Sequence, residues 1–341
     1  MPQLNSPTAG GNSFGLTSVI DPEIPTLSAV LDAERLSSDA KLLSLSPWPG
    51  EELQRTELRI LKWHRRARCA FEIALHIDIP WQLIGKVYAE DRPDVLQVME
   101  AIRRAGFDER AEFSIPKPFA YVQSLRLLLV QKVEGIQAKR IFLEGDARQR
   151  SMAAIRCAQW LARFHALGPM PGRVVGPSVV VERSRNRCKH IAEKCPPLGS
   201  KAQRLIEQIA AAAMSLADVP MSLGHGDFLP GHVLLTENQV VAIDWDSFVL
   251  SDPSRDVAWF MIGLRRLAEK YLGSIQALDR PAALFLETYL AMGRPGVEGT
   301  LPFHKAALCL QRAKRYVFKD GWGWQERAEV MLDEGLQAIK S

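Results

Sequence analysis

The spacing of hydrophobic residues divides the chain into a first part with strand patterns and a second part with helix patterns. Short apolar runs rich in β-forming residues occupy positions 59–77, 81–89 and 120–135, and the first contains a basic turn. We therefore predict two strands around that turn, then a third strand, then two further short strands. Residues 92–107 show helical spacing, with Pro93 near the start and Gly106 at the end. This part predicts a small antiparallel sheet with one helix.

After Gly135 the helical period dominates the pattern. Two short apolar runs, at 233–235 and 240–243, predict a pair of strands. A small sheet followed by a helical part is typical of an α+β fold with two lobes. We predict an extension over residues 1–50, disordered at first and then helical, a first lobe over 51–133 and a second over 134–341. The segments with helical spacing are 151–168, 200–217, 256–272, 281–292, 303–318 and 324–340.

Composition excludes several classes of protein. Lys and Arg number 43 against 39 Asp and Glu, and no block of like charge predicts a nucleic-acid partner. The five cysteines are an odd number without a CxxC pair, which argues against a disulfide framework or a structural zinc site. The N-terminus lacks the pattern of a signal peptide, and no apolar run approaches the roughly 18 residues of a membrane span. We expect a cytoplasmic protein without a membrane partner.

Two carboxylates in the stretch "GHGDFLPGHVLLTENQVVAIDWD", residues 224–246, carry the candidate chemistry. Asp227 follows His225-Gly226 in a turn, and Asp244 ends the second apolar run. Pairing of the two short strands would bring Asp244 near the first turn. Two carboxylates placed in this way suit a general base and a ligand for a hard metal ion. The alternative role for both is turn capping.

The order and spacing of four motifs resemble the aminoglycoside phosphotransferase family, whose members are small-molecule kinases with a protein-kinase-like fold. The resemblance implies a bilobal fold and an enzyme that uses ATP or GTP with Mg²⁺ or Mn²⁺. The motifs are Leu-Ala-Arg-Phe-His-Ala-Leu-Gly at 161–168, His-Gly-Asp at 225–227, Ile-Asp-Trp-Asp at 243–246 and Ser-Asp-Pro-x-x-Asp at 251–256.

The resemblance also implies roles for five residues of these motifs. Asp227 is the catalytic residue that accepts the proton of the substrate hydroxyl or orients that hydroxyl. Asp244 binds the metal ion that bridges the β- and γ-phosphates. His225 and Asp256 hold the loop by hydrogen bonds. Asp246 either supports the loop or contacts the metal ligands without binding the ion itself.

In the first lobe the resemblance implies a nucleotide site. Lys86, in the middle of "LIGKVYA", would reach the α- and β-phosphates, and Glu100 of the following helix would pair with it, with Glu90 and Asp94 as alternatives. The backbone from Gln131 to Val133 resembles the hinge that holds the adenine edge.

The chain departs from the family pattern at two places. His232 stands where most members have an asparagine that binds metal. It would act through water or a phosphate, or bind metal directly and favour Mn²⁺, or mark an inactive site. The turn "KWHRRARCA" has no glycine, so Arg66 and Arg68, with Arg65, would grip phosphates by bidentate contacts, or form a solvated basic hairpin.

These features predict a kinase of a small-molecule hydroxyl acceptor. Residues 168–200 resemble a family insertion that shapes specificity, and their six cations against two acids would repel a polycationic aminoglycoside. A neutral or acidic acceptor of the sugar or amino-alcohol type fits better. Trp322 and Trp324 would stack on a sugar ring or pack a helix end. The alternatives are a nucleotide-binding pseudokinase with a regulatory role and an aminoglycoside-modifying kinase.

Overall fold

The structure is a computed structural model that describes residues 20–38, 55–76, 81–168, 170–216, 220–292, 296–319 and 323–340. The chain forms two compact units. The first comprises Met1–Ala101 and Pro116–Lys132, and the second comprises Ile102–Ile115 and Val133–Ser341. Residues 102–115 thus belong to the second unit, although they lie within the predicted first lobe.

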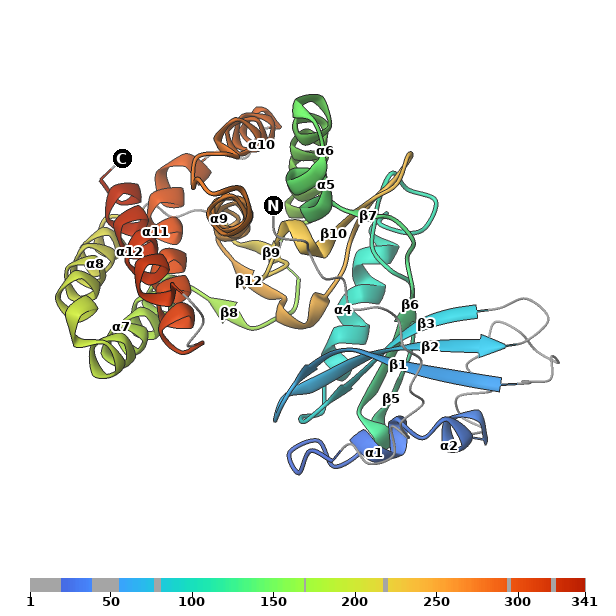
Figure 1. The fold of residues 1–341 in the computed structure, drawn as a ribbon. Helices are drawn as coiled ribbons and strands as arrows, with labels where there is room; N and C mark the ends of the chain where they lie inside the picture. Colours follow the sequence, from blue (N-terminus) through green and yellow to red (C-terminus); the bar gives the residue numbers. More distant parts are fainter. Residues whose placement is uncertain are drawn as a thin grey trace, which may run out of the picture. The chain divides into compact units, whose positions relative to one another are not determined.

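The first unit is built on a five-stranded antiparallel sheet (Figure 1). All five strands predicted from the sequence are present, and the predicted helix is α4 (Pro93–Arg104). The register pairs β1 with β2 and β2 with β3 as successive hairpins, and β6 then lies between β3 and β5. In sheet order the strands are β1 (Arg55–His64), β2 (Arg68–His76), β3 (Trp81–Tyr88), β6 (Leu127–Gln131) and β5 (Pro118–Val122).

The described part of the N-terminal extension covers one face of this sheet. It forms two short helices, α1 (Leu27–Val30) and α2 (Ala33–Ser38). Leu27 and Val30 are fully buried in one cluster with Phe71 of β2 and side chains of β3 and β6. The side-chain hydroxyl of Thr26 also donates to the carbonyl of Leu125, at 2.8 Å. The extension therefore supplies part of the core, while the disorder predicted up to Gly15 lies outside the described residues.

The second unit contains two small sheets beside its helices. The predicted pair of strands is confirmed as β10 (Val233–Leu235) and β11 (Val240–Ala242), which are antiparallel. The other strands were not predicted, because runs of two or three residues leave no periodic pattern and pair with distant segments. These are β4 (Phe113–Ser114) and β7 (Ile136–Gln137) in the first sheet, and β8 (Val174–Val175), β12 (Val249–Ser251) and β9 (Ser222–Gly224) in the second.

All six helices predicted for the second part are present. They are α6 (Ala147–His165), α8 (Pro196–Met214), α9 (Ser254–Leu272), α10 (Asp279–Ala291), α11 (Val297–Val317) and α12 (Trp324–Ala338). Helix α8 begins four residues before the expected Ser200, because Pro196 is compatible with a first helical turn. Two helices were missed, α5 (Ala138–Glu144) and α7 (Pro177–Lys194), and α7 fills most of the segment interpreted as an insertion.

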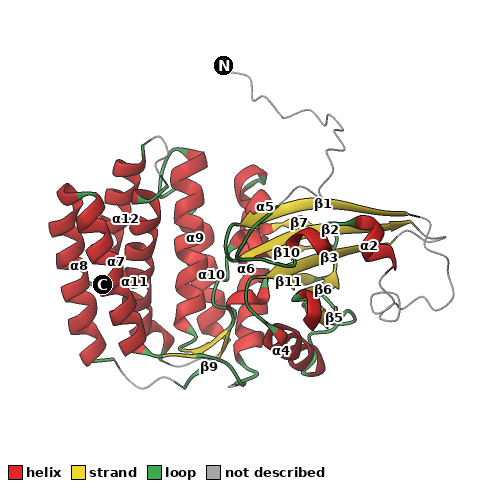
Figure 2. Cartoon of the chain, turned by 90° about the horizontal axis from the view of Figure 1, so that it is seen from below, coloured by secondary structure: helices red, strands yellow, loops and turns green. Residues whose placement is uncertain are grey.

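Four of these helices, α7, α8, α11 and α12, pack side by side around one hydrophobic core (Figure 2). Their contact is close enough to require a small residue at Gly335, where a Cβ would lie 2.8 Å from Leu205. The antiparallel sheet and the mainly helical second unit together confirm the predicted α+β class. Among the described residues, no helix is long and apolar enough to cross a membrane.

Candidate active site

The pairing of β10 with β11 brings the predicted catalytic and metal residues together. His232 ends the 3₁₀ helix η3 (Pro230–His232), directly before β10, and its carbonyl accepts the N–H of Ile243 at 2.9 Å. As a result His232 lies between the two carboxylates. Its Nε2 is 3.5 Å from Asp244 Oδ2 and its Nδ1 is 3.8 Å from Asp227 Oδ2. The side chains of Asp227 and Asp244 remain 30% and 17% exposed, so a ligand can reach both.

The hydrogen bonds of His232 fix which ring nitrogen faces Asp244. Its Nδ1 lies 2.8 Å from the backbone carbonyl of Asp227. A carbonyl oxygen only accepts, so Nδ1 carries the proton and donates it there. In the neutral ring, Nε2 then presents a lone pair toward Asp244.

Two residues with positive φ shape the turns around the site. Asp244 is a non-glycine residue with φ 70°, a conformation that costs about 1–2 kcal/mol, and it directly precedes the 3₁₀ helix η4 (Trp245–Ser247). Gly226 has φ 78°, and a Cβ there would lie 1.9 Å from the carbonyl oxygen of Ser247. The glycine of the His-Gly-Asp motif is therefore required by the close approach of η4.

Asp256 holds the candidate catalytic turn, residues 225–227, through its buried carboxylate. It accepts the backbone N–H groups of His225 and Gly226, at 2.6 and 2.9 Å, and lies 3.4 Å from Nε2 of His165. The other ring nitrogen of His165 lies 2.7 Å from the hydroxyl of Tyr289. Burial raises the pKa of Asp256, but the bond with His165 and the neighbouring positive charges outweigh it, and the pKa lies below its usual 3.8.

His165 and Tyr289 are site residues that the sequence interpretation did not name. His165 falls within the "LARFHALG" motif, so the resemblance offered a signal for it, whereas Tyr289 lies in α10 with no motif around it.

His225 and Asp246, the other two residues predicted to support the loop, are buried. His225 donates from Nε2 to the carbonyl of Ile243 at 2.9 Å, and burial lowers the pKa of its ring. Asp246 lies in η4 and is 8% exposed. Burial of this degree leaves Asp246 less accessible to a ligand than Asp244.

In the first unit, Lys86 lies on β3 opposite Ala70 of β2 and Leu128 of β6. Side chains alternate along a strand, and the neighbouring Val87 is buried in the cluster beneath α1. Lys86 therefore points to the other face of the sheet. Glu100 is exposed on α4. The ion pair between Lys86 and Glu100 stays a prediction.

The basic turn between β1 and β2 is held by a residue of the N-terminal extension. Arg66 occupies the left-handed region, with φ 64°, and Arg68 begins β2. Asp21 accepts the backbone N–H of Arg66 at 2.8 Å and the indole N–H of Trp63 at 3.1 Å. The bond from Arg66 lowers the pKa of Asp21 despite its burial. No sequence signal linked Asp21 to a turn 45 residues away.

The predicted hinge residues fall at the end of β6. The backbone N–H of Gln131 donates to the carbonyl of Lys117 at 2.8 Å, so it is committed to the sheet. Val133 begins the longer segment of the second unit, Val133–Ser341. The contact of Val133 with the adenine edge stays a prediction.

Asp244 and His232 are the residues that fit a metal ion bound with a nucleotide. The described residues contain no group of three or more His, Cys, Asp or Glu side chains able to hold a metal by themselves. Mg²⁺ in nucleotide sites commonly takes one or two protein ligands and completes its shell with phosphate oxygens and water. The pair of side chains suits such a shared ion and does not suit a closed structural metal site.

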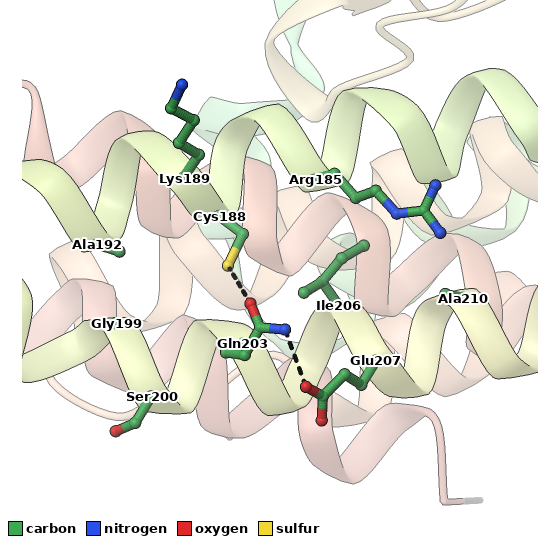
Figure 3. Close-up of a pocket in the computed structure, with 10 residues that line it drawn as sticks. All are labelled: Arg185, Cys188, Lys189, Ala192, Gly199, Ser200, Gln203, Ile206, Glu207 and Ala210. Carbon is green, nitrogen blue, oxygen red and sulfur yellow. Dashed lines mark hydrogen bonds between the residues drawn. The ribbon is translucent and has the colours of Figure 1, made fainter.

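A groove of about 590 Å³ lies between α7 and α8 (Figure 3). Three of its polar side chains are linked by hydrogen bonds. Cys188 Sγ donates to Gln203 Oε1 at 3.6 Å, and Gln203 Nε2 donates to Glu207 Oε1 at 2.9 Å. Since these groups point along the groove toward each other, they do not converge on a ligand.

The basic segment of α7 lies beside the start of α9. Arg183 and Arg187 line a small cavity of about 20 Å³ together with Arg255. Burial, followed by the charges of Arg183 and Arg255, lowers the pKa of Arg187 to about 10. Burial also lowers the pKa of Arg255, while the charge of Asp227 opposes that shift.

Comparison with known sequences gives one family match. The model of a family described as "Phosphotransferase enzyme family" (APH) matches residues 83–299, which include every motif residue from His165 to Asp256. Among curated proteins, no sequence matches this chain.

Solved structures with a similar fold include small-molecule kinases. The choline kinase LicA from Streptococcus pneumoniae has a TM-score of 0.58 at 14% identity, over 83% of this chain and 93% of its own. Spectinomycin phosphotransferase, in complex with ADP and spectinomycin, has a TM-score of 0.56 at 14% identity, over 91% and 97%. A glucosamine kinase has a TM-score of 0.56 at 14% identity, over 88% and 80%. At these identities the likeness establishes the fold.

Proposed function

This chain belongs to the phosphotransferase enzyme family, and from that premise we propose that it transfers the γ-phosphate of ATP or GTP to a hydroxyl group of a small molecule. The proposal rests above all on one observation, the convergence of Asp227, His232 and Asp244 at the end of the β10–β11 hairpin. The names of the similar structures, which are kinases of choline and glucosamine and a spectinomycin phosphotransferase, support a small-molecule acceptor.

Asp227 is the residue that we assign to the acceptor hydroxyl. Its carboxylate is accessible, and the turn that carries it is held by Asp256 through two backbone N–H groups. Phosphoryl transfer depends mainly on positioning and charge stabilisation, so a rigid turn that orients the hydroxyl oxygen is of direct use. Asp227 would accept the hydroxyl proton as the oxygen attacks the γ-phosphorus.

Asp244 and His232 would hold the metal ion that accompanies the nucleotide. When bound, a Mg²⁺ or Mn²⁺ ion neutralises charge on the β- and γ-phosphates. The carboxylate of Asp244 suits either ion, whereas the imidazole of His232 suits Mn²⁺ better. Direct binding through Nε2 of His232 therefore favours Mn²⁺, and binding through an intervening water leaves Mg²⁺ and Mn²⁺ closer to equal.

We assign Lys86, in the first unit, to the nucleotide phosphates, and Val133, in the second unit, to the adenine edge. Arg66 and Arg68 would contribute cationic contacts in place of a glycine-rich loop. The bond from Arg66 N–H to Asp21 supports this role, because it fixes the backbone of the turn without a glycine.

The decisive experiment measures release of ADP or GDP against pools of sugars, amino alcohols, their acidic derivatives and aminoglycosides, with Mg²⁺ and with Mn²⁺. Asp227→Asn is the test variant, and Asp279→Asn, at a half-buried residue of α10 outside the candidate site, is the matched control. Acceptor-dependent release that Asp227→Asn abolishes and Asp279→Asn retains supports the kinase. Nucleotide binding without release from any pool, in wild type and both variants, supports the pseudokinase instead.

A further inference from the structure

A second, strongly basic pocket lies in the second unit, between α9, α11 and α12. It has a volume of about 240 Å³. Two aromatic side chains, Tyr316 and Trp324, complete its wall. The cations that line it are Arg266, Lys270, Arg312, Arg315, Lys319 and Arg327.

The negative charges of the described residues do not balance these cations. In the described part of the chain, Arg327 is the one member with a carboxylate partner, Glu269, at 3.0 Å. The cations repel one another as a consequence. The charge of Arg315, followed by burial and the charges of further pocket cations, lowers the pKa of Lys319.

Several hydrogen-bond donors on the pocket wall are buried without an acceptor. Arg312 is only 2% exposed, yet its Nε and Nη2 have no hydrogen-bond partner among the described residues. The same holds for Nε of Arg266 and the hydroxyl of Tyr316. The ring centroid of Trp259 lies 4.7 Å from Cζ of Arg312. The ring covers one face of the guanidinium, so it does not accept hydrogen bonds from the N–H groups in the guanidinium plane.

Unsatisfied buried donors are costly, and here they belong to three residues that line one pocket. Burial and the charge of Arg266 lower the pKa of Arg312 to about 10, which still leaves it charged at neutral pH. A group of guanidinium donors that lacks an acceptor is the arrangement that binds oxyanions by bidentate hydrogen bonds.

The pocket adjoins the candidate catalytic turn through one face of α9. Trp259, Gly263, Arg266 and Lys270 follow one another at spacings of four, three and four residues, so they share that face. At Gly263 a Cβ would lie 2.9 Å from Pro230, which follows the catalytic turn. Asp227 is also near enough for its charge to raise the pKa of Arg312 against the effect of burial.

We propose that this pocket binds a phosphate monoester group carried by the acceptor, so that the enzyme phosphorylates a hydroxyl of an already phosphorylated small molecule. This inference rests on the proposed kinase function. A phosphate monoester brings nearly two negative charges and three acceptor oxygens, which suits six cations and several unused donors better than one carboxylate does. The volume of about 240 Å³ fits such a terminal group, while the hydroxyl of the same molecule faces Asp227.

The first test measures binding of inorganic phosphate to the ADP-loaded protein by calorimetry, at constant ionic strength. Arg315→Gln is the main variant, because Arg315 is exposed and its loss leaves the core intact, and Arg266→Gln is the second. Arg280→Gln on α10, exposed and outside the pocket, is the control with the same change of charge. We expect both pocket variants to raise the Kd for phosphate about tenfold and the control to leave it unchanged. No binding, or equal binding in all four proteins, overturns the pocket.

The second test compares matched acceptors with and without a phosphate group, such as a sugar and its phosphate monoester. We expect turnover of the phosphorylated member, with a raised KM and a little-changed kcat in Arg315→Gln. Carboxylated acceptors form a third arm, and preference for them would overturn the choice of phosphate.

The two tests separate the possible failures. Phosphate binding that depends on Arg315, combined with equal use of neutral acceptors, would make the pocket a regulatory anion site and overturn its assignment to the acceptor. Phosphate binding without turnover of any acceptor would overturn the kinase proposal, and with it the acceptor assignment, while the pocket itself would stand.

Discussion

Asp256 and Arg312 are both buried charges of the second unit, and their surroundings differ. Asp256 accepts two backbone N–H groups and lies against His165, so the fold itself supplies its partners. Arg312 carries N–H groups that find no acceptor among the described residues. A buried charge without a partner is strongly destabilising. The contrast indicates that Asp256 has a structural purpose, whereas Arg312 and its neighbours are arranged for a ligand from outside the chain.

The largest effect that we expect is on kcat. It concerns Asp227, whose turn is held by Asp256. Asp227→Asn keeps the size of the side chain but removes the carboxylate that would accept the hydroxyl proton. We expect kcat to fall by about 10²–10⁴-fold while the folded structure persists. Steady-state kinetics beside a thermal unfolding curve would check both points. Activity within threefold of wild type would show that Asp227 is not the group facing the hydroxyl.

Asp256→Asn should mainly affect stability. The amide has one oxygen to accept the two N–H groups, and it cannot offset the charges around it. We expect a loss of about 3 kcal/mol in the free energy of unfolding. Because the folded pKa of Asp256 is depressed, its contribution is fully present above its unfolded value near 3.8 and is lost as pH falls through the folded pKa.

Denaturant titrations of wild type and Asp256→Asn between pH 7 and pH 3 measure this difference. The difference in free energy of unfolding between the two proteins should be constant above pH 4 to 5 and become smaller below that range. A gap that widens in acid would mean that the carboxyl group is already protonated in the folded protein.

The basic pocket predicts that the effect of Arg315→Gln on the free energy of unfolding changes sign with the anion in the buffer. In chloride at low ionic strength, Arg315→Gln relieves repulsion among the pocket cations and should raise the free energy of unfolding by a few tenths of a kcal/mol. In saturating phosphate it removes a ligand contact and should leave the variant about 1 kcal/mol less stable than wild type. Thermal unfolding of both proteins in both buffers, with Arg280→Gln as control, measures it. The same sign in both buffers would contradict the anion site.

The smallest effect concerns His232. His232→Asn replaces a nitrogen ligand by an amide oxygen, which should shift the ratio of Mn²⁺ to Mg²⁺ activity toward Mg²⁺ by several-fold. Activity titrations with each metal ion in both proteins provide the ratio. An unchanged ratio would remove His232 from direct contact with the ion and leave its bond to the Asp227 carbonyl as its role.

The sequence was most informative where local order carries the chemistry. The turn at Asp227, the hairpin of β10 and β11, and Asp244 at its end all lie within 18 residues, so spacing and strand pairing were enough to place them together. The sequence was less informative where contacts are long-range. Asp21 reaches the turn at Arg66 from the extension, and Tyr289 reaches His165 across 124 positions.

The sequence by itself determined the α+β class, the long helices and the motif residues of the catalytic turn, because hydrophobic period and short-range spacing are local properties of a chain. The tertiary structure alone decided the basic pocket. Arg266, Arg312 and Arg327 belong to three different helices, and each of them taken singly is an ordinary basic residue on an amphipathic helix. Their side chains line one pocket only when α9, α11 and α12 pack together. The same packing buries Arg312 without bringing an acceptor of the described residues to its Nε and Nη2.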